Sequence, residues 1–139
     1  MSVVTRKIRE LHSPIPEACT YFFPEIRDLA LVEVHFTPSL PFDWFRNLIK
    51  RKAGGFTYGR DVYLRTNPAE DPSYWNLNPF DVESVGLLFH ELTHVLQFQK
   101  SRLPVWLAYL LNMSGLEAEA EQVQKTFSLR YSQTFLTQI

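Results

Sequence analysis

The segment from Val82 to Lys100 constrains the fold of this chain more than any other. It reads VESVGLLFHELTHVLQFQK, and its apolar residues recur at the spacing of one helix face. Asp81 stands directly before the segment, and a carboxylate at that position commonly caps the first turn of a helix. We therefore predict one long amphipathic helix over these residues.

Two histidines and a glutamate lie in the middle of this predicted helix. His90 and His94 are four residues apart, so their rings project from the same face, one turn apart. Zinc accepts neutral imidazole nitrogens, and a helix fixes the angle between two such ligands. Glu91, next to the first histidine, can take a proton from a metal-activated water. The pattern predicts His90 and His94 as ligands of Zn²⁺ and Glu91 as a general base.

The same string also has an ordinary interpretation. Shuffling this composition, which contains four histidines, yields an HExxH string in about one chain in a hundred. The segment could then be two unrelated histidines with a helix-favouring glutamate between them. The flanking apolar residues favour the metal hypothesis, because they bury the helix and place both rings in a partly dry site.

A catalytic zinc usually has three protein ligands and one open position, so a third ligand is needed. The candidates are His12, His35 and three glutamates of a predicted last helix. On that helix Glu117 and Glu121 share a face, whereas Glu119 points to the other side. We favour Glu117 as the ligand and Glu121 as the acceptor for the distal nitrogen of a ligating histidine. The alternative is a solvated acidic face that suits the helix dipole.

Composition limits the class of protein. The chain has 139 residues, 45% of them apolar, which suits one domain spanning residues 1–139. Its formal charge of −1, with acidic and basic residues mixed, predicts neither a nucleic-acid nor a membrane partner. The single cysteine, Cys19, cannot form an internal disulfide. The first residues lack the apolar core of a signal peptide and no long apolar run follows, so we expect a soluble, cytoplasmic protein.

The remaining patterns predict an α+β domain. Alternating β-branched residues indicate strands, helical spacing indicates helices, and the pair Gly59-Arg60 suits a tight hairpin turn. Gly115 marks a reversal between two helices. The expected elements are a short helix at 16–22, a strand at 30–36, a helix at 41–52, hairpin strands at 55–58 and 61–65, a loop at 66–80, a short buried helix at 105–112 and a last helix at 116–132.

Together, the HELTH segment and the later EAEAE segment resemble those of the gluzincin zinc peptidases. In that family the HExxH helix is followed by a second helix that supplies a glutamate ligand in an ExxxD-type motif. Glu117 matches the ligand, and Glu121 stands where the family usually has aspartate. More narrowly, the run from GFTYGRDVYL through LLFHELTHVLQFQ resembles the small metallopeptidase-like domain of bacterial toxins and contractile injection systems. This resemblance covers roughly residues 30–124.

The resemblance implies a minimal zincin that hydrolyses peptide bonds with zinc, acting on a peptide or protein substrate. Its sheet would have about three strands, packed on the HExxH helix and the Glu-bearing helix. It also implies that the first hairpin strand, comprising Gly55, Phe56, Thr57 and Tyr58, lies at the sheet edge and binds an extended substrate. The alternative for this strand is an ordinary hairpin covered by the loop at 66–80.

The oxyanion stabiliser of the larger gluzincins has no obvious equivalent here. Arg130, Tyr131 and Tyr74 carry suitable donors, and the sequence does not choose among them. Two further hypotheses therefore stay open. One is a catalytically silent, zinc-stabilised binding module that uses the same ligands. The other is a helical domain without a metal, in which the resemblance is accidental.

Overall fold

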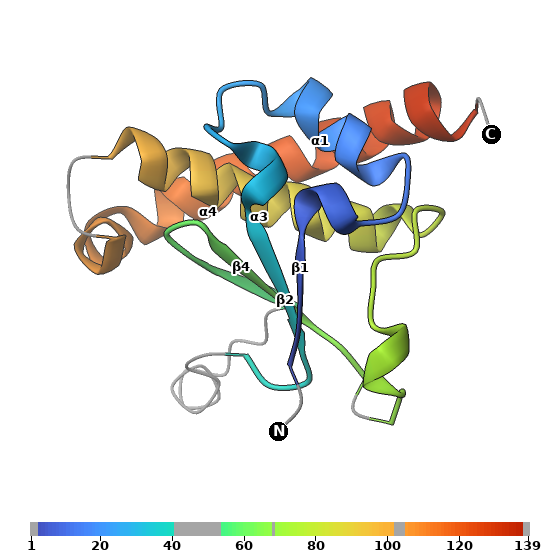
Figure 1. Cartoon of the computed structure of the whole chain (residues 1–139). Helices are drawn as coiled ribbons and strands as arrows, with labels where there is room; N and C mark the ends of the chain where they lie inside the picture. Colours follow the sequence, from blue (N-terminus) through green and yellow to red (C-terminus); the bar gives the residue numbers. More distant parts are fainter. Residues whose placement is uncertain (1–2, 41–53, 68, 102–104, 138–139) are drawn as a thin grey trace.

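The computed structural model describes residues 3–40, 54–67, 69–101 and 105–137, with the backbone alone for residues 105–114. The described chain is α+β, with a four-stranded mixed sheet against a pair of long helices (Figure 1). The helix α1 lies on the other side of that pair from the sheet (Figure 1). The bounds are β1 Val4–Lys7, α1 Ile15–Phe22, β2 Glu33–Thr37, β3 Gly55–Tyr58, β4 Asp61–Arg65, α3 Val82–Lys100 and α4 Val105–Tyr131.

The strands are arranged in the order β1-β2-β4-β3. The two outer pairs, β1 with β2 and β3 with β4, are antiparallel, and the central pair of β2 with β4 is parallel. The prediction of about three strands was therefore one short, because no strand was predicted before residue 30. β1 has only four residues, and it pairs with a strand about thirty positions away, as in Val4 with Phe36.

The hairpin of β3 and β4 has the predicted bounds. Gly59 has a φ of 63°, a conformation that suits glycine and closes the two-residue turn. β3 lies at the end of the described strand order, as predicted for an edge strand. Gly55, at its start, allows a close approach to α3, because a Cβ there would lie 3.0 Å from the Cγ and Oε2 atoms of Glu91.

The helix α3 spans the predicted residues, Val82–Lys100. The carboxylate of Asp81 accepts hydrogen bonds from the backbone N–H and the hydroxyl of Ser84, so the predicted cap is confirmed. The middle of the helix is surrounded by other elements rather than half exposed. Its fully buried apolar residues are Val85, Leu88, Phe89, Leu92 and Val95.

One long helix, α4, replaces the two helices predicted after Pro104. The predicted reversal at Gly115 was wrong, since the helix runs through that residue without a break. A glycine inside a helix costs about 1 kcal/mol relative to alanine, which a helix of 27 residues tolerates. A single π-helical turn, Ser132–Leu136, follows α4.

The other predicted elements have different outcomes. The short helix at 16–22 corresponds to α1, and the strand at 30–36 begins later, after a 3₁₀ turn at Leu29–Leu31. The loop at 66–80 contains one 3₁₀ turn, Pro72–Tyr74. The helix predicted at 41–52 lies outside the described residues.

Aromatic rings hold α1 against the pair of α3 and α4. Phe22 of α1 stacks on Phe127 of α4 with ring centroids 4.7 Å apart, and it meets Phe89 of α3 edge-on at 5.4 Å. Such contacts combine large apolar burial with a preferred ring geometry. Phe22 thus contacts both helices of the pair. The antiparallel packing of α3 on α4 brings together the polar residues described next.

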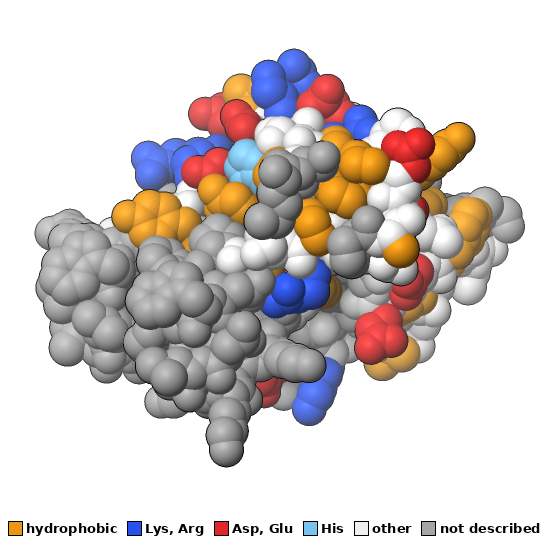
Figure 2. All heavy atoms as spheres, turned by 90° about the horizontal axis from the view of Figure 1, so that it is seen from below, with side chains coloured by type: hydrophobic (Ala, Val, Ile, Leu, Met, Phe, Trp, Pro, Cys, Tyr) orange, Lys and Arg blue, Asp and Glu red, His pale blue; other side chains and the backbone are white. Residues whose placement is uncertain are grey.

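Two surface properties are relevant to partners: the apolar length of the helices and the distribution of charge. Within the described part of the chain, the helices are too short or too polar to cross a membrane. Acidic and basic side chains stand next to each other on the face seen in Figure 2, so neither charge sign dominates the described part of that face.

Candidate metal centre

His90, His94 and Glu117 converge between α3 and α4. The Nε2 atom of His94 lies 2.7 Å from Glu117 Oε1, and that of His90 lies 3.3 Å from Glu117 Oε2. The two rings are 5.1 Å apart and nearly perpendicular, as expected for histidines one helical turn apart. The sequence prediction of these three residues as one cluster is therefore confirmed as geometry.

The cluster is largely shielded from solvent. His94 is 1% exposed and His90 is 8% exposed, whereas the Glu117 side chain is 22% exposed. Burial of polar groups is costly unless each has a partner. The three residues are thus a preformed set of two imidazoles and one carboxylate, with its remaining access to solvent beside Glu117.

The other nitrogen of each ring is held by a glutamine amide oxygen. His94 Nδ1 lies 2.7 Å from Gln97 Oε1, and His90 Nδ1 lies 2.9 Å from Gln124 Oε1. The Gln97 amide orientation has a second support, because its nitrogen donates to the carbonyl oxygen of Leu116. A carbonyl oxygen only accepts, so the Gln97 oxygen must be the atom that faces His94.

These contacts determine where the protons are. An amide oxygen cannot donate, so Nδ1 of His94 carries the hydrogen and the neutral ring has its lone pair on Nε2. That lone pair faces the Glu117 carboxylate, which is also an acceptor. Two acceptors at 2.7 Å need either one further proton, shared between the ring and the carboxylate, or a metal ion between them.

The donor set fits a metal ion. Zinc lies about 2.0–2.1 Å from imidazole nitrogen and carboxylate oxygen, so two ligand atoms of a tetrahedral site are about 3.3 Å apart. His90 and Glu117 already have that separation. His94 and Glu117 are closer, at 2.7 Å, and would separate by about 0.6 Å to admit the ion. His90, His94 and Glu117 could therefore hold a metal ion.

Without a metal, protons would balance the charges. Burial alone would raise the pKa of Glu117, but its hydrogen bonds to His90 and His94 outweigh burial and lower it. Burial alone would lower the pKa of His90, but Glu117 and the charge of Glu91 raise it. Both shifts favour the charged forms, a negative carboxylate beside a positive ring, and a cation of another kind would take the same place.

Glu91 lies beside the cluster rather than in it. Its Oε1 atom accepts a hydrogen bond from the Thr57 hydroxyl at 2.8 Å, and its Oε2 atom lies 4.0 Å from His90 Nε2. Glu91 is 3% exposed, and burial raises its pKa in spite of the neighbouring histidines. One oxygen is thus fixed by β3 while the other is directed toward the candidate metal position.

The predicted role of Glu121 on α4 needs correction. Glu121 does not accept from a ligating histidine, because Gln97 and Gln124 occupy the two Nδ1 atoms. Glu121 instead lines a pocket next to Gln124. Glutamine at position 124 is two turns beyond Glu117 on the same helix face, so it reaches His90 where Glu121 does not.

Arg130 and Tyr131 are too far along α4 to act as oxyanion stabilisers. Glu117 is thirteen residues before Arg130, which corresponds to about 20 Å along a helix. The Arg130 guanidinium lies 5.2 Å from the Phe22 ring centroid. The Tyr131 hydroxyl donates to the carbonyl of Pro79, and burial raises its pKa to about 12. Tyr74, in the 3₁₀ turn, is 74% exposed.

The other candidates for the third metal ligand do not belong to the group of His90, His94 and Glu117. His12 is exposed beyond β1, and Glu119 accepts a hydrogen bond from the Gln97 amide at 2.9 Å. His35 belongs to a second cluster on β2 and β4, with Nε2 3.0 Å from Asp61 Oδ1 and 4.0 Å from Glu33 Oε2. This exposed cluster is the second group of side chains that could hold an ion among the described residues.

The predicted substrate strand lies next to Glu91. Gly55 approaches its side chain, and the Thr57 hydroxyl contacts both its carboxylate and its backbone carbonyl oxygen. Thr57 is fully buried, whereas Tyr58 is 50% exposed and Phe56 is half-buried. The strand therefore positions the predicted base directly, and its part in substrate binding stays a prediction.

Three side-chain roles at this site were missed. Gln97 and Gln124 orient the two rings, and the Thr57 hydroxyl holds Glu91. Gln97 could have been found, since it lies three residues after His94 on the same helix face. The other two depend on how β3 and α4 pack against α3, which spacing alone does not encode.

Comparison with known proteins gives no independent assignment. No family model matches the chain, and neither a curated protein nor a solved structure shows significant similarity to it.

Proposed function

We propose that this protein is a zincin-like, zinc-dependent peptidase whose metal ligands are His90, His94 and Glu117. A set of two imidazoles and one carboxylate is typical of catalytic zinc sites. Zinc bound there would polarise a substrate carbonyl and make an activated water available at neutral pH. The substrate would be a peptide or protein, presented along the edge strand β3.

The observation that carries this proposal is the position of Glu91. A site that only cross-links α3 to α4 needs its three ligands. It has no use for a second, buried carboxylate that does not bind the metal. Here Glu91 is 3% exposed, is held by Thr57 on one oxygen, and has its other oxygen 4.0 Å from His90 Nε2. In that position Glu91 would accept a proton from the attacking water and deliver it to the leaving amine.

A zinc-stabilised binding module is the second candidate. The ligands come from two helices, so an ion would join α3 to α4 and its binding would contribute to folding. The proposed oxyanion donors on α4 are also remote from the ligands. Within the described residues, this arrangement is the feature that favours a structural metal without turnover.

Replacing Glu91 by glutamine separates the two candidates. The zinc-loaded wild type is incubated with a mixed-sequence peptide library, and products are followed by mass spectrometry. Glu91→Gln should retain one zinc per chain and lose cleavage by about 10²- to 10⁴-fold. Glu33→Gln, the same substitution in the exposed cluster, is the matched control and should keep both. A wild type that holds zinc and cleaves nothing would contradict the peptidase proposal and leave the binding module.

A further inference from the structure

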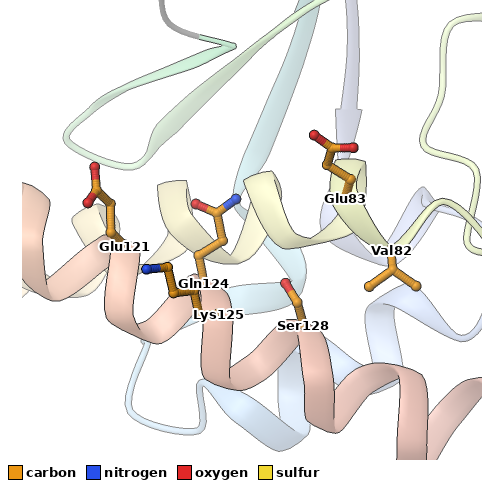
Figure 3. A pocket seen from close by; sticks show the side chains of 6 residues that line it. All are labelled: Val82, Glu83, Glu121, Gln124, Lys125 and Ser128. Carbon is orange, nitrogen blue, oxygen red and sulfur yellow. The ribbon is translucent and has the colours of Figure 1, made fainter.

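A pocket of about 530 Å³ lies between α3 and α4, next to the candidate metal centre. Figure 3 shows Glu121, Gln124 and Glu83 projecting to the same side of the helix pair. The volume is within the range of small-ligand and side-chain pockets. The lining residues are Val82, Glu83, Glu121, Gln124, Lys125 and Ser128.

One residue of the pocket lining also contacts the cluster. Gln124, which forms part of its wall, holds Nδ1 of His90 at 2.9 Å. Glu121 is one helical turn beyond Glu117 on the same face of α4, about 6 Å along the axis. A side chain in the pocket would therefore belong to a residue close to the bond positioned at the metal.

The charges of the lining favour a basic occupant. Glu83 and Glu121 each carry a negative charge and Lys125 one positive charge, so the pocket has an excess of one negative charge. No ion pair within 4.0 Å joins Lys125 to either glutamate among the described residues. Val82 is the single apolar lining residue, yet most of the lining surface is apolar, because the stems of the longer side chains contribute to it. Such a lining suits the alkyl stem of a lysine or arginine, and the glutamates suit its charged end.

We propose that this pocket selects a lysine or arginine side chain of the substrate next to the scissile bond. The inference rests on the proposed peptidase function for the meaning of "substrate", and it adds the chemical class that the site prefers. Glu83 and Glu121 are its specificity residues. Lys125 opposes them and limits the preference.

Binding is measured separately from cleavage, so that the two proposals can fail separately. The probes are two fluorescein-labelled heptapeptides with blocked termini, identical except for lysine or glutamate at the central position. Fluorescence anisotropy gives their affinities for zinc-loaded Glu91→Gln protein, and the zinc-loaded wild type is assayed for their cleavage. We expect the lysine peptide to bind about fivefold more tightly, with a smaller ratio at high salt.

Neutralising variants test the assignment to this pocket. In the same Glu91→Gln background, Glu121→Gln or Glu83→Gln should reduce the lysine-to-glutamate ratio by about threefold. Lys125→Gln is the matched control with the opposite sign, and it should raise the ratio. Circular dichroism verifies that each variant is folded.

The outcomes are distinct. Three results would overturn the pocket assignment: equal affinities for the two peptides, no binding of either peptide, or a ratio that the three substitutions do not change. If the peptides are nevertheless cleaved, the peptidase proposal stands. Selective binding that depends on Glu83 and Glu121, without cleavage of these peptides or of the mixed-sequence library by the wild type, would support a pocket for basic side chains. It would refute the peptidase proposal and with it the position next to a scissile bond.

Discussion

The part of the chain that the structure describes contains two clusters of histidine and carboxylate side chains, and their environments differ. The buried cluster joins His90 and His94 of α3 to Glu117 of α4. The exposed cluster joins Glu33 and His35 of β2 to Asp61 of β4, on the surface of the sheet. Each brings three potential ligand atoms within 4.8 Å of one another, so residue type and spacing alone do not separate them.

The partner of the second ring nitrogen separates them. In the buried cluster that partner of His94 is an amide oxygen, which forces the lone pair of the neutral ring toward Glu117. In the exposed cluster, His35 Nδ1 lies 2.8 Å from the Thr5 hydroxyl, which can donate. Nε2–H of His35 can then donate to Asp61 at 3.0 Å. The exposed cluster is satisfied by a neutral histidine, whereas the buried cluster needs one further proton or a metal ion between His94 and Glu117.

Solvent exposure also distinguishes the two clusters. The side chains of Glu33 and Asp61 are 47% and 49% exposed, so water and salt screen their charges. His94 is 1% exposed and has no comparable screening. The comparison teaches that a candidate metal site is distinguished by preoriented ring nitrogens in a dry place, rather than by a count of ligand-type residues.

The largest expected effect is on thermal stability with and without zinc. An ion that binds the folded state at about 1,000 times its Kd adds about 4 kcal/mol, which corresponds to roughly 10 °C in Tm for a domain of this size. We expect that difference between the zinc-loaded and chelator-treated wild type by differential scanning fluorimetry. His94→Ala should abolish the difference, and His35→Ala should retain it. The opposite result would reverse the assignment of the two clusters.

A smaller effect is expected when the orientation of a ligand is disturbed. Gln124→Leu removes the acceptor for Nδ1 of His90 and should weaken zinc binding by about 10- to 100-fold, measured by competition with a chromogenic chelator. Gln122→Leu makes the same change nearby on α4, where the amide contacts Thr126, and should leave the affinity unchanged. Equal affinities in the two variants would show that the glutamine does not orient the ring.

The smallest effect is the pH dependence of the metal-free protein. The pKa of Glu117 is lowered from 4.5, so its contribution to stability is present above pH 4.5 and is lost on acidification. The pKa of His90 is raised from 6.5, so its contribution is present below pH 6.5 and is lost as the pH rises. Relative to His90→Gln, the wild type should therefore gain most between about pH 4.5 and 6.5, on the order of 1 kcal/mol.

Urea unfolding in the presence of a chelator measures this difference at each pH. His35→Gln, the same substitution in the exposed cluster, should keep the extra stability between about pH 4.5 and 6.5. A wild type and a His90→Gln variant that differ by the same free energy from pH 4 to pH 9 would contradict the ionic description of the buried cluster.

The sequence predicted the elements that depend on local signals. The helix α3 was found with its bounds because Asp81 caps it and its pattern is uninterrupted, and the hairpin was found because Gly59 suits its turn. β1 was missed because its pairing with β2 is long-range. The break at Gly115 was predicted from a local preference that the continuous helix α4 overrides.

The candidate site likewise contains residues that the sequence predicted and residues that it did not. His90, Glu91 and His94 follow from one helical motif, and Glu117 follows from the acidic face of a second helix. The oxyanion candidates Arg130 and Tyr131 were chosen for their donors alone, and the course of α4 carries both away from the cluster. The role of Gln124 depends on the crossing of α3 and α4, which is a property of the packed molecule.

The metal content of purified protein tests the central claim most directly. Zinc per chain is measured by inductively coupled plasma mass spectrometry after loading and dialysis, for the wild type, His94→Ala and His35→Ala. We predict one zinc in the wild type and in His35→Ala, and none in His94→Ala. A zinc-free wild type, or a stoichiometry that falls in His35→Ala and not in His94→Ala, would contradict the assignment of the buried cluster as the metal site.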